Sequence, residues 1–409
     1  MSGNGRGLYQ SMPTEEYMKA IYGDAYDAVS EPKFRITDWG MERYMGSAPP
    51  IDWLIEGVLP RATPGLVASI GGVGKSYLLL DLCVRIAAGP GSGYGAQFAL
   101  GGKIKSQGKA IMLTAEESQS AVHRRLDQIV LPALKEQLQD QLYVVPIPDT
   151  GGNVTFLTSS RGEYRMSPAW RDVCDEVNSI EGVDLVVMDP LQVFAAADIN
   201  SDPAAAQTFW SSVSVLCASS GASVLVAHHM RKDDHIDGPF SARAAIRGTS
   251  ALCDGARAVF AIWLASDEER ATASQALDYV IGPMEMAHGC IVKSNDIGMG
   301  EPRTFLRDQE TGLLNDRTEE LMDEIAEAQT ITETQRIQIF DEVSKRWEQE
   351  RPFSPSPQAG GRYLGRWMME QYRISKQSAR AYIQEWRDDG FLVYNKNESS
   401  GGLRGLRVG

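Results

Sequence analysis

Cysteine is scarce in this sequence and is never arranged in pairs. Five cysteines are scattered among 409 residues, and no Cys-x-x-Cys pair occurs. Zinc sites and disulfide frameworks are usually marked by such spacings. We therefore expect neither, and we interpret the cysteines as small core residues of a reduced, cytoplasmic protein.

Long apolar runs are also missing. No run approaches the roughly 20 residues that a bilayer-spanning helix needs, and the first seven residues carry no apolar signal segment. We therefore expect no membrane contact. The length and the 43% hydrophobic content predict two or three domains with a sizeable core.

Net positive charge is lacking as well. The chain carries −14, which at first argues against nucleic acid as a partner. However, residues 351–409 hold ten Lys or Arg against five Asp or Glu, so the remaining residues carry −19. Such asymmetry favours a nucleic-acid-binding element at the C-terminal end. An ordinary solvated surface is the alternative, and it stays open.

What the chain does contain is a glycine-rich segment between an apolar run and a helical pattern. This order is typical of a phosphate-binding loop, whose backbone N–H groups surround phosphate oxygens. Lys75 would reach the β- and γ-phosphates of ATP, and Ser76 would place its hydroxyl on Mg²⁺. Ser69 stands where the usual motif has its first glycine. The predicted nucleotide-binding residues of this segment are Gly71, Gly72, Val73, Gly74, Lys75, Ser76 and Tyr77.

Short apolar runs alternate with helical patterns through the central part of the chain. This alternation predicts an α/β fold with a mainly parallel, doubly wound sheet. Ligands bind such sheets at the carboxyl ends of the strands. The predicted strands are 65–70, 109–114, 142–147, 183–190, 223–227, 258–264 and 289–294.

Three carboxylates directly follow predicted strands. Asp189 follows four apolar residues, and we predict that it helps to hold Mg²⁺. Its alternative role is to cap a helix. Glu116 and Glu117 follow the strand 109–114, and we predict that Glu116 orients the attacking water while Glu117 supports it. Alternatively, both complement the dipole of the next helix.

Two histidines and several cations also follow strands. His228 and His229 suit a sensor of the γ-phosphate better than a zinc site, because only His235 is near them in sequence. A structural role stays open for one of the two. Arg247 and Lys293 are candidates for a cation that stabilises transition-state charge, supplied within one chain or by another.

The predicted organisation has four parts. An N-terminal arm (1–48) precedes the ATPase core (49–316), and an acidic linker with a helix (317–350) follows the core. In residues 351–409 we expect a small α+β domain, with two helices and a strand pair that resemble a winged helix-turn-helix.

These motifs together resemble the RepA-like branch of the RecA-type ATPases, the hexameric replicative helicases of plasmids and phages. The resemblance covers about residues 50–315 and rests on the phosphate loop, Ala-Glu-Glu-Ser from Ala115, Met-Asp-Pro-Leu from Met188, Ala-His-His from Ala227, and Arg-Gly-Thr-Ser from Arg247. It implies a RecA-like core, a hexameric ring and Arg247 as the arginine finger of a neighbouring subunit. Lys293-x-Asn295 is similar to the Lys-x-Arg region of DnaB-type helicases, with Asn in place of Arg.

The resemblance also implies a partner and an activity. The loop Met230–Ile246 would contact single-stranded DNA in the ring's channel, and residues 351–409 would bind duplex DNA or a replication protein. We hypothesise an ATP-hydrolysing DNA helicase of plasmid or phage replication. The alternatives are a non-helicase RecA-like ATPase of regulation or recombination, and a DNA-binding regulator to which the nucleotide is only a ligand.

Overall fold

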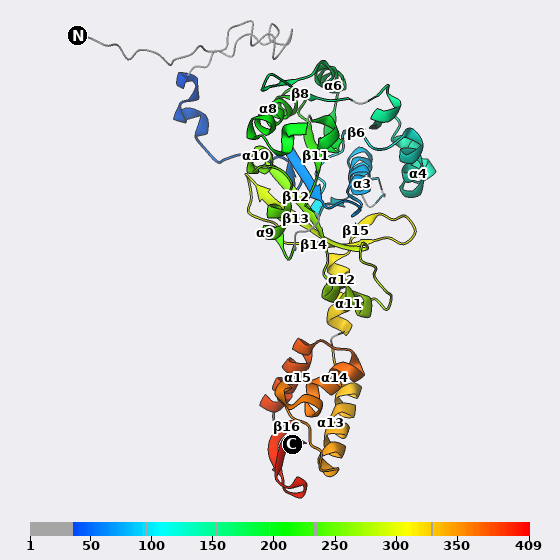
Figure 1. Cartoon of the computed structure of the whole chain (residues 1–409), viewed down its shortest axis with the longest axis vertical. Coiled ribbons are helices and arrows are strands. Elements are labelled where there is room, and N and C mark those ends of the chain that lie inside the picture. The colour runs from blue at the N-terminus through cyan, green and yellow to red at the C-terminus, as the bar shows by residue number, and fades with distance from the viewer. Residues whose placement is uncertain are drawn as a thin grey trace, which may run out of the picture. The chain divides into compact units, whose positions relative to one another are not determined.

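The computed structural model describes residues 36–409 apart from 93, 95, 96, 153, 196, 232–235 and 329. Most of the predicted N-terminal arm lies outside the described residues. The centre of the fold is a nine-stranded sheet in the order β15-β14-β13-β12-β3-β11-β10-β6-β7 (Figure 1). Its strands are β3 (Pro64–Ser69), β6 (Lys109–Thr114), β7 (Leu142–Pro146), β10 (Val183–Asp189), β11 (Ser223–His229), β12 (Ala258–Leu264), β13 (Met286–Ser294), β14 (Arg303–Arg307) and β15 (Leu314–Asp316).

The sheet is mainly parallel, as predicted. The six strands from β12 to β7 pair in parallel with one another. Their carboxyl ends therefore lie along one edge, where the predicted site residues follow β3 and β6 or end β10 and β11. The predicted α/β fold class is confirmed.

Both faces of the sheet are buried, which explains why these strands are continuously apolar. Alternate residues of one face, including Leu66, Val186 and Val224, share a hydrophobic cluster with Phe209 of α8 (Pro203–Ser220). Helix α3 (Lys75–Ala88) packs on the sheet on the side away from α8 (Figure 1). The helix that follows the phosphate loop is thus held rigidly against the sheet.

Further helices and small hairpins connect the strands. Two segments outside the predicted strands contain regular structure: residues 89–108 hold β4 (Phe98–Ala99) and β5 (Gly102–Lys103), and the predicted loop 230–246 holds α9. The other elements that precede β15 are η1 (Ile36–Trp39), η2 (Met41–Tyr44), β1 (Trp53–Ile55), β2 (Leu59–Pro60), α4 (Gln119–Ile129), α5 (Pro132–Gln137), η3 (Ile147–Asp149), β8 (Leu157–Ser160), β9 (Glu163–Met166), α6 (Pro168–Ser179), α7 (Leu191–Phe194), η4 (Ala197–Asn200), α9 (Pro239–Ala245), α10 (Ser250–Gly255) and α11 (Asp267–Ala276).

The chain divides into two compact units. The first reaches Trp263 and also includes Ala287–Arg303 and Arg307–Asp316. The second comprises Leu264–Met286, Thr304–Leu306 and Arg317–Gly409, so two short segments of the predicted core belong to it.

The second unit contains the predicted helix pair and hairpin. Its elements after β15 are α12 (Thr318–Ala328), α13 (Glu333–Glu348), η5 (Pro357–Arg362), α14 (Leu364–Tyr372), α15 (Lys376–Asp388), β16 (Leu392–Asn397), η6 (Glu398–Ser400) and β17 (Leu403–Val408), with β16 and β17 antiparallel. Ile339 and Val343 of α13 share a core with Ile383 and Trp386 of α15. The helix that we expected in the linker therefore packs into the same core as residues 351–409.

No helix formed by the described residues combines the length and apolar character needed to cross a membrane.

Candidate nucleotide-binding site

The glycine-rich segment forms a tight loop between β3 and α3. Gly72 and Gly74 have φ values of 86° and 104°, a region that side chains with a Cβ rarely adopt. Ser69 is instead the last residue of a fully buried strand, and its backbone is not in this region. A serine is therefore tolerated where the usual motif has glycine.

The loop's lysine is paired with the carboxylate at the end of β10. Lys75 Nζ lies 3.0 Å from Asp189 Oδ1, and the two side chains are only 6% and 4% exposed. One strand, β11, separates β3 from β10. The fold thus brings together two residues that are 114 positions apart.

Glu116 and Glu117 differ in their surroundings. Helix α4 begins at Gln119 after the cap Ser118, and its first turn holds no acid, so neither glutamate occupies the first turn. Glu117 is bound to Arg125 at 2.5 Å. Burial raises the pKa of Glu117, and the Arg125 charge lowers it. The charges of Asp189 and Glu116 raise it further. Glu116 is exposed, with no ion pair to the described residues.

The two histidines point to opposite sides of β11, because side chains alternate along a strand. His228 is fully buried, and its Nε2 donates to the carbonyl of Arg247 at 3.0 Å. Its Nδ1 has no partner among the described residues. Burial lowers the pKa of His228 to about 4.

His229 is the histidine that lies near the reactive groups. It pairs in register with Ser69 at the end of β3. The pKa of His229 is lowered by burial first and then by the charges of Lys75 and Arg247. The charges of Glu116 and Asp189 raise it. His228 thus fits the structural role that the sequence left open, and His229 fits the sensor.

The candidate cations are held differently. The Arg247 side chain is half-buried and has no acidic partner within the described part of the chain. Lys293 Nζ donates to the carbonyls of Asp254, at 2.8 Å, and Ala256. Burial lowers the pKa of Lys293. These contacts tie Lys293 to the end of α10, while Arg247 remains available.

Magnesium would suit the residues at the loop. Ser76 supplies a hydroxyl in the first turn of α3, and Asp189 supplies a buried carboxylate whose Oδ1 contacts Lys75. Mg²⁺ commonly takes one or two such protein ligands and fills its shell with phosphate oxygens and water. This donor set therefore fits the ion. The described residues contain no group of three or more His, Cys, Asp or Glu side chains that could hold a metal.

Tyr77 packs away from the loop. Its hydroxyl donates to the carbonyl of Arg125 at 3.4 Å, and the Arg125 guanidinium lies 5.3 Å from the ring centroid. Tyr77 therefore joins α3 to α4, which carries the partner of Glu117.

Sequence reasoning missed one contact of the loop. Arg307, at the end of β14, donates from Nη2 to the carbonyl of Val73 at 2.7 Å and from Nη1 to that of Gly312 at 2.8 Å. A trans peptide points its C=O and N–H in opposite directions, so this contact turns the Gly74 amide away from Arg307. No local motif marks Arg307, because it lies 234 residues after its partner.

Comparison with known proteins gives one family and several similar folds. The family AAA_25, described as an AAA domain, matches residues 30–235, slightly more than half of the chain. The ATPase domain of G40P is 11% identical with a TM-score of 0.43, over 69% of this chain and 96% of that one. The KaiC-like protein PH0186 from Pyrococcus horikoshii OT3 is 14% identical with a TM-score of 0.40, over 65% and 95%.

Proposed function

Since the chain belongs to the AAA_25 family of AAA domains, we propose that it is a P-loop ATPase that hydrolyses ATP with Mg²⁺. The observation that carries this proposal is the buried pair of Lys75 and Asp189 at the glycine-rich loop. Lys75 would bind the β- and γ-phosphates, and the loop amides would surround them. Ser76 and Asp189 would hold Mg²⁺, which when bound neutralises charge on the phosphates.

Glu116 would orient the attacking water. It is exposed, whereas Glu117 is fixed by Arg125, so the two glutamates take different roles. Glu117 would position Glu116 by anchoring the segment that joins β6 to α4. His229 would sense the γ-phosphate, since the charges of Lys75, Glu116 and Asp189 all act on it.

Phosphate release from ATP tests this proposal. Lys75→Ala and Glu116→Gln should each reduce turnover at least about 100-fold, because each removes a group that acts in the transition state. Lys135→Ala is the matched control, since Lys135 forms an exposed pair with Asp127 on α4–α5. Unchanged turnover in Lys75→Ala would refute the proposal.

We further propose that the ATPase is a ring-forming DNA helicase that translocates on single-stranded DNA. Support comes from the segment Met230–Ile246, which leaves β11 next to His229 and returns to Arg247. Its residues 232–235 lie outside the described part. Arg231 donates to the carbonyl of Ala244 and Arg243 pairs with Asp254 at 3.2 Å, so two of its cations already have partners.

An aromatic side chain on the same segment offers a different contact. Phe240, in the first turn of α9, is 79% exposed. Exposed aromatic rings bind single strands by stacking with bases, which contributes about 1–3 kcal/mol per base. Phe240 therefore supports single-stranded DNA as the partner of this segment.

Arg247 would complete the site of a neighbouring copy as an arginine finger. Its side chain has no acidic partner among the described residues, unlike that of Arg243. Mixing Lys75→Ala chains with Arg247→Ala chains tests this arrangement. Recovered turnover in the mixture indicates shared sites, while its absence in mixed oligomers contradicts them.

Strand displacement separates the helicase from the alternative, a non-helicase DNA-dependent ATPase. A forked duplex should be unwound with ATP and not in the Glu116→Gln variant. An oligomer with the mass of a ring, hexameric by resemblance, should be detected by light scattering with ATP and single-stranded DNA. DNA-stimulated hydrolysis without unwinding would favour the alternative.

A further inference from the structure

The second helix of the C-terminal pair has one buried side and one exposed, charged side. Helices α14 and α15 are joined by a short turn through Arg373 and the cap Ser375. Ala379, Ile383 and Trp386 of α15 are buried in the core. The exposed residues of α15 include the cations Lys376, Arg380 and Arg387 and the acids Glu385 and Asp388.

These cations differ from three arginines of the same unit. Arg336, Arg346 and Arg366 of the same unit each pair with a glutamate on their own helix. None of the three cations of α15 has an acidic partner within the described ranges. The exposed side of α15 therefore carries three cations that are open to an external polyanion, and Arg404 and Arg407 of β17 likewise have no acidic partner among the described residues.

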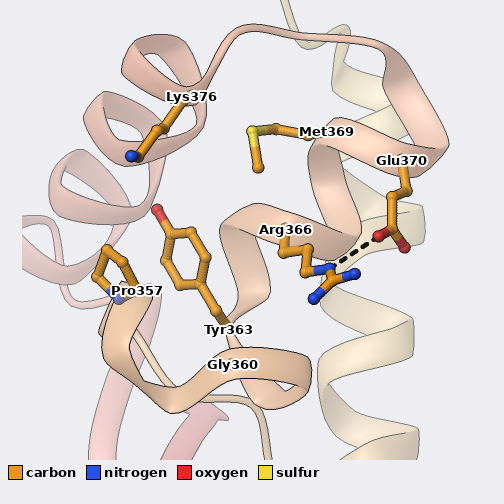
Figure 2. A pocket seen from close by; sticks show the side chains of 7 residues that line it. All are labelled: Pro357, Gly360, Tyr363, Arg366, Met369, Glu370 and Lys376. Atoms are coloured by element: carbon orange, nitrogen blue, oxygen red, sulfur yellow. Dashed lines mark hydrogen bonds and ion pairs between the residues drawn. The ribbon is translucent and has the colours of Figure 1, made fainter.

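A pocket of about 500 Å³ lies beside the start of α15. Figure 2 shows Tyr363, Arg366, Glu370 and Lys376 among the side chains that line it. Tyr363 is 4% exposed, and its hydroxyl has no hydrogen-bond partner among the described residues. A buried hydroxyl without a partner is costly, so this group is a candidate donor to a ligand.

The backbone makes room for this hydroxyl. A Cβ at position 365 would lie 2.4 Å from the Tyr363 oxygen, so glycine is needed there. Figure 2 shows the hydroxyl directed toward the side of the pocket that carries Lys376. The hydroxyl is shielded from solvent, and Lys376 lines that side of the pocket. A phosphate would meet the hydroxyl only where this wall opens.

We infer that this pocket binds a backbone phosphate of duplex DNA and thereby places α15 along the major groove. The inference deepens the proposed function by naming duplex DNA as the partner of this unit. Lys376 is the first residue of the 13-residue α15, so a phosphate at this point also meets the amides of the helix's first turn. Arg380 and Arg387 would continue along the same duplex.

A helix fits the major groove, which is about 12 Å wide. Gln377 is exposed on α15 between the cations, and glutamine side chains can hydrogen-bond base edges. Gln384 is also exposed, but its Nε2 donates to Asp388 Oδ1 at 2.8 Å. The groove of duplex DNA thus matches both the shape of α15 and its side chains, whereas a protein partner would leave the cations without a regular array of anions.

One carboxylate opposes the phosphate. Glu370 lines the pocket and binds Arg366 Nε at 3.0 Å. Removing its charge would free Arg366 for the phosphate. Glu370→Gln should therefore tighten duplex binding, a change of opposite sign to that caused by loss of Lys376.

The test measures binding of the full chain to a fluorescent 24-base-pair duplex between about 50 and 200 mM salt. Lys376→Gln should weaken binding to all sequences and lower the slope of log K against log salt by about 1. The combined Lys376→Gln, Arg380→Gln and Arg387→Gln variant should lower the slope by about 3. Tyr363→Phe keeps the ring and should weaken binding about 2- to 12-fold, the effect of one hydrogen bond. Glu370→Gln should strengthen it.

Arg336→Gln is the control, since it makes the same charge change on α13, where Glu333 pairs with the arginine; it should change neither affinity nor slope. The inference is overturned if the wild type binds no duplex, if the triple variant keeps the wild-type slope, or if Glu370→Gln weakens binding. ATP turnover is measured on the same samples. Duplex binding without turnover would refute the proposed ATPase and leave this inference standing.

Discussion

The buried pair of Lys75 and Asp189 should affect the free energy of unfolding most strongly when only one partner is removed. Lys75→Met leaves the Asp189 carboxylate, 4% exposed, without the cation 3.0 Å away. Breaking a buried pair in this way costs about 3–5 kcal/mol, because an uncompensated charge stays in the interior. In a domain of this size, 1 kcal/mol shifts Tm by roughly 2–4 °C. We therefore expect Tm to fall by about 6–20 °C.

A second substitution should restore the stability but not the activity. Asp189→Asn in the Lys75→Met background removes the unpaired charge, so the free energy of unfolding should recover by at least about 2 kcal/mol. Turnover should stay abolished, since the double variant lacks both the phosphate-binding cation and the proposed magnesium ligand.

Thermal and urea unfolding, followed by circular dichroism, measure both effects. Lys135→Met is the control, because its pair with Asp127 is exposed and should contribute less than about 1 kcal/mol. If Lys75→Met unfolds within 2 °C of the wild type, or if the double variant is no more stable than the single one, the electrostatic reasoning fails.

Three further predictions concern other parts of the site. Because the pKa of the buried His228 is lowered to about 4, its contribution to the free energy of unfolding is fully present above pH 6.5. As pH falls toward 4, the free energy of unfolding decreases by up to about 1.4 kcal/mol per pH unit, because the unfolded chain takes up the proton first. Urea unfolding should show a flatter pH profile in His228→Gln. Phe240→Ala should weaken binding of single-stranded DNA about 5- to 100-fold while Phe240→Trp retains it, and equal affinities in a fluorescence titration would exclude stacking. Arg307→Ala should raise the Kd for ATP about 10-fold with Arg307→Lys in between, because the Val73 carbonyl loses its donor; Arg303→Ala, on the same strand but paired with Asp316, should leave the nucleotide Kd unchanged.

Much of the sheet could be predicted because its strands are buried on both faces. The predicted strands 109–114 and 258–264 have the observed bounds, since a short apolar run between polar turns has few other structures available. Helix α9 was missed although Gly238 is its N-cap and Pro239 its first residue, a sequence typical of a helix start. The charged residues around it had favoured a loop.

The site was predictable only where a motif is local. The phosphate loop and the residues after each strand follow from sequence order and the rule that parallel strands end at one edge. The different surroundings of His228 and His229 required the folded structure, because sequence does not tell which of two adjacent strand residues is buried. The partners Arg125 and Arg307 required the folded chain, since neither lies near a recognisable pattern.

The contact between Arg307 and Val73 also bears on where the functional unit ends. The family match stops at residue 235 and contains the glycine-rich loop, both glutamates, Asp189 and both histidines. Yet β12, which pairs with β3, and Arg307, which holds the loop, come later in the chain. The segment that the family match covers is therefore shorter than the segment that must fold together to hold the glycine-rich loop. A fragment cut at the family boundary would retain these motif residues and expose one edge of the strand that carries the loop.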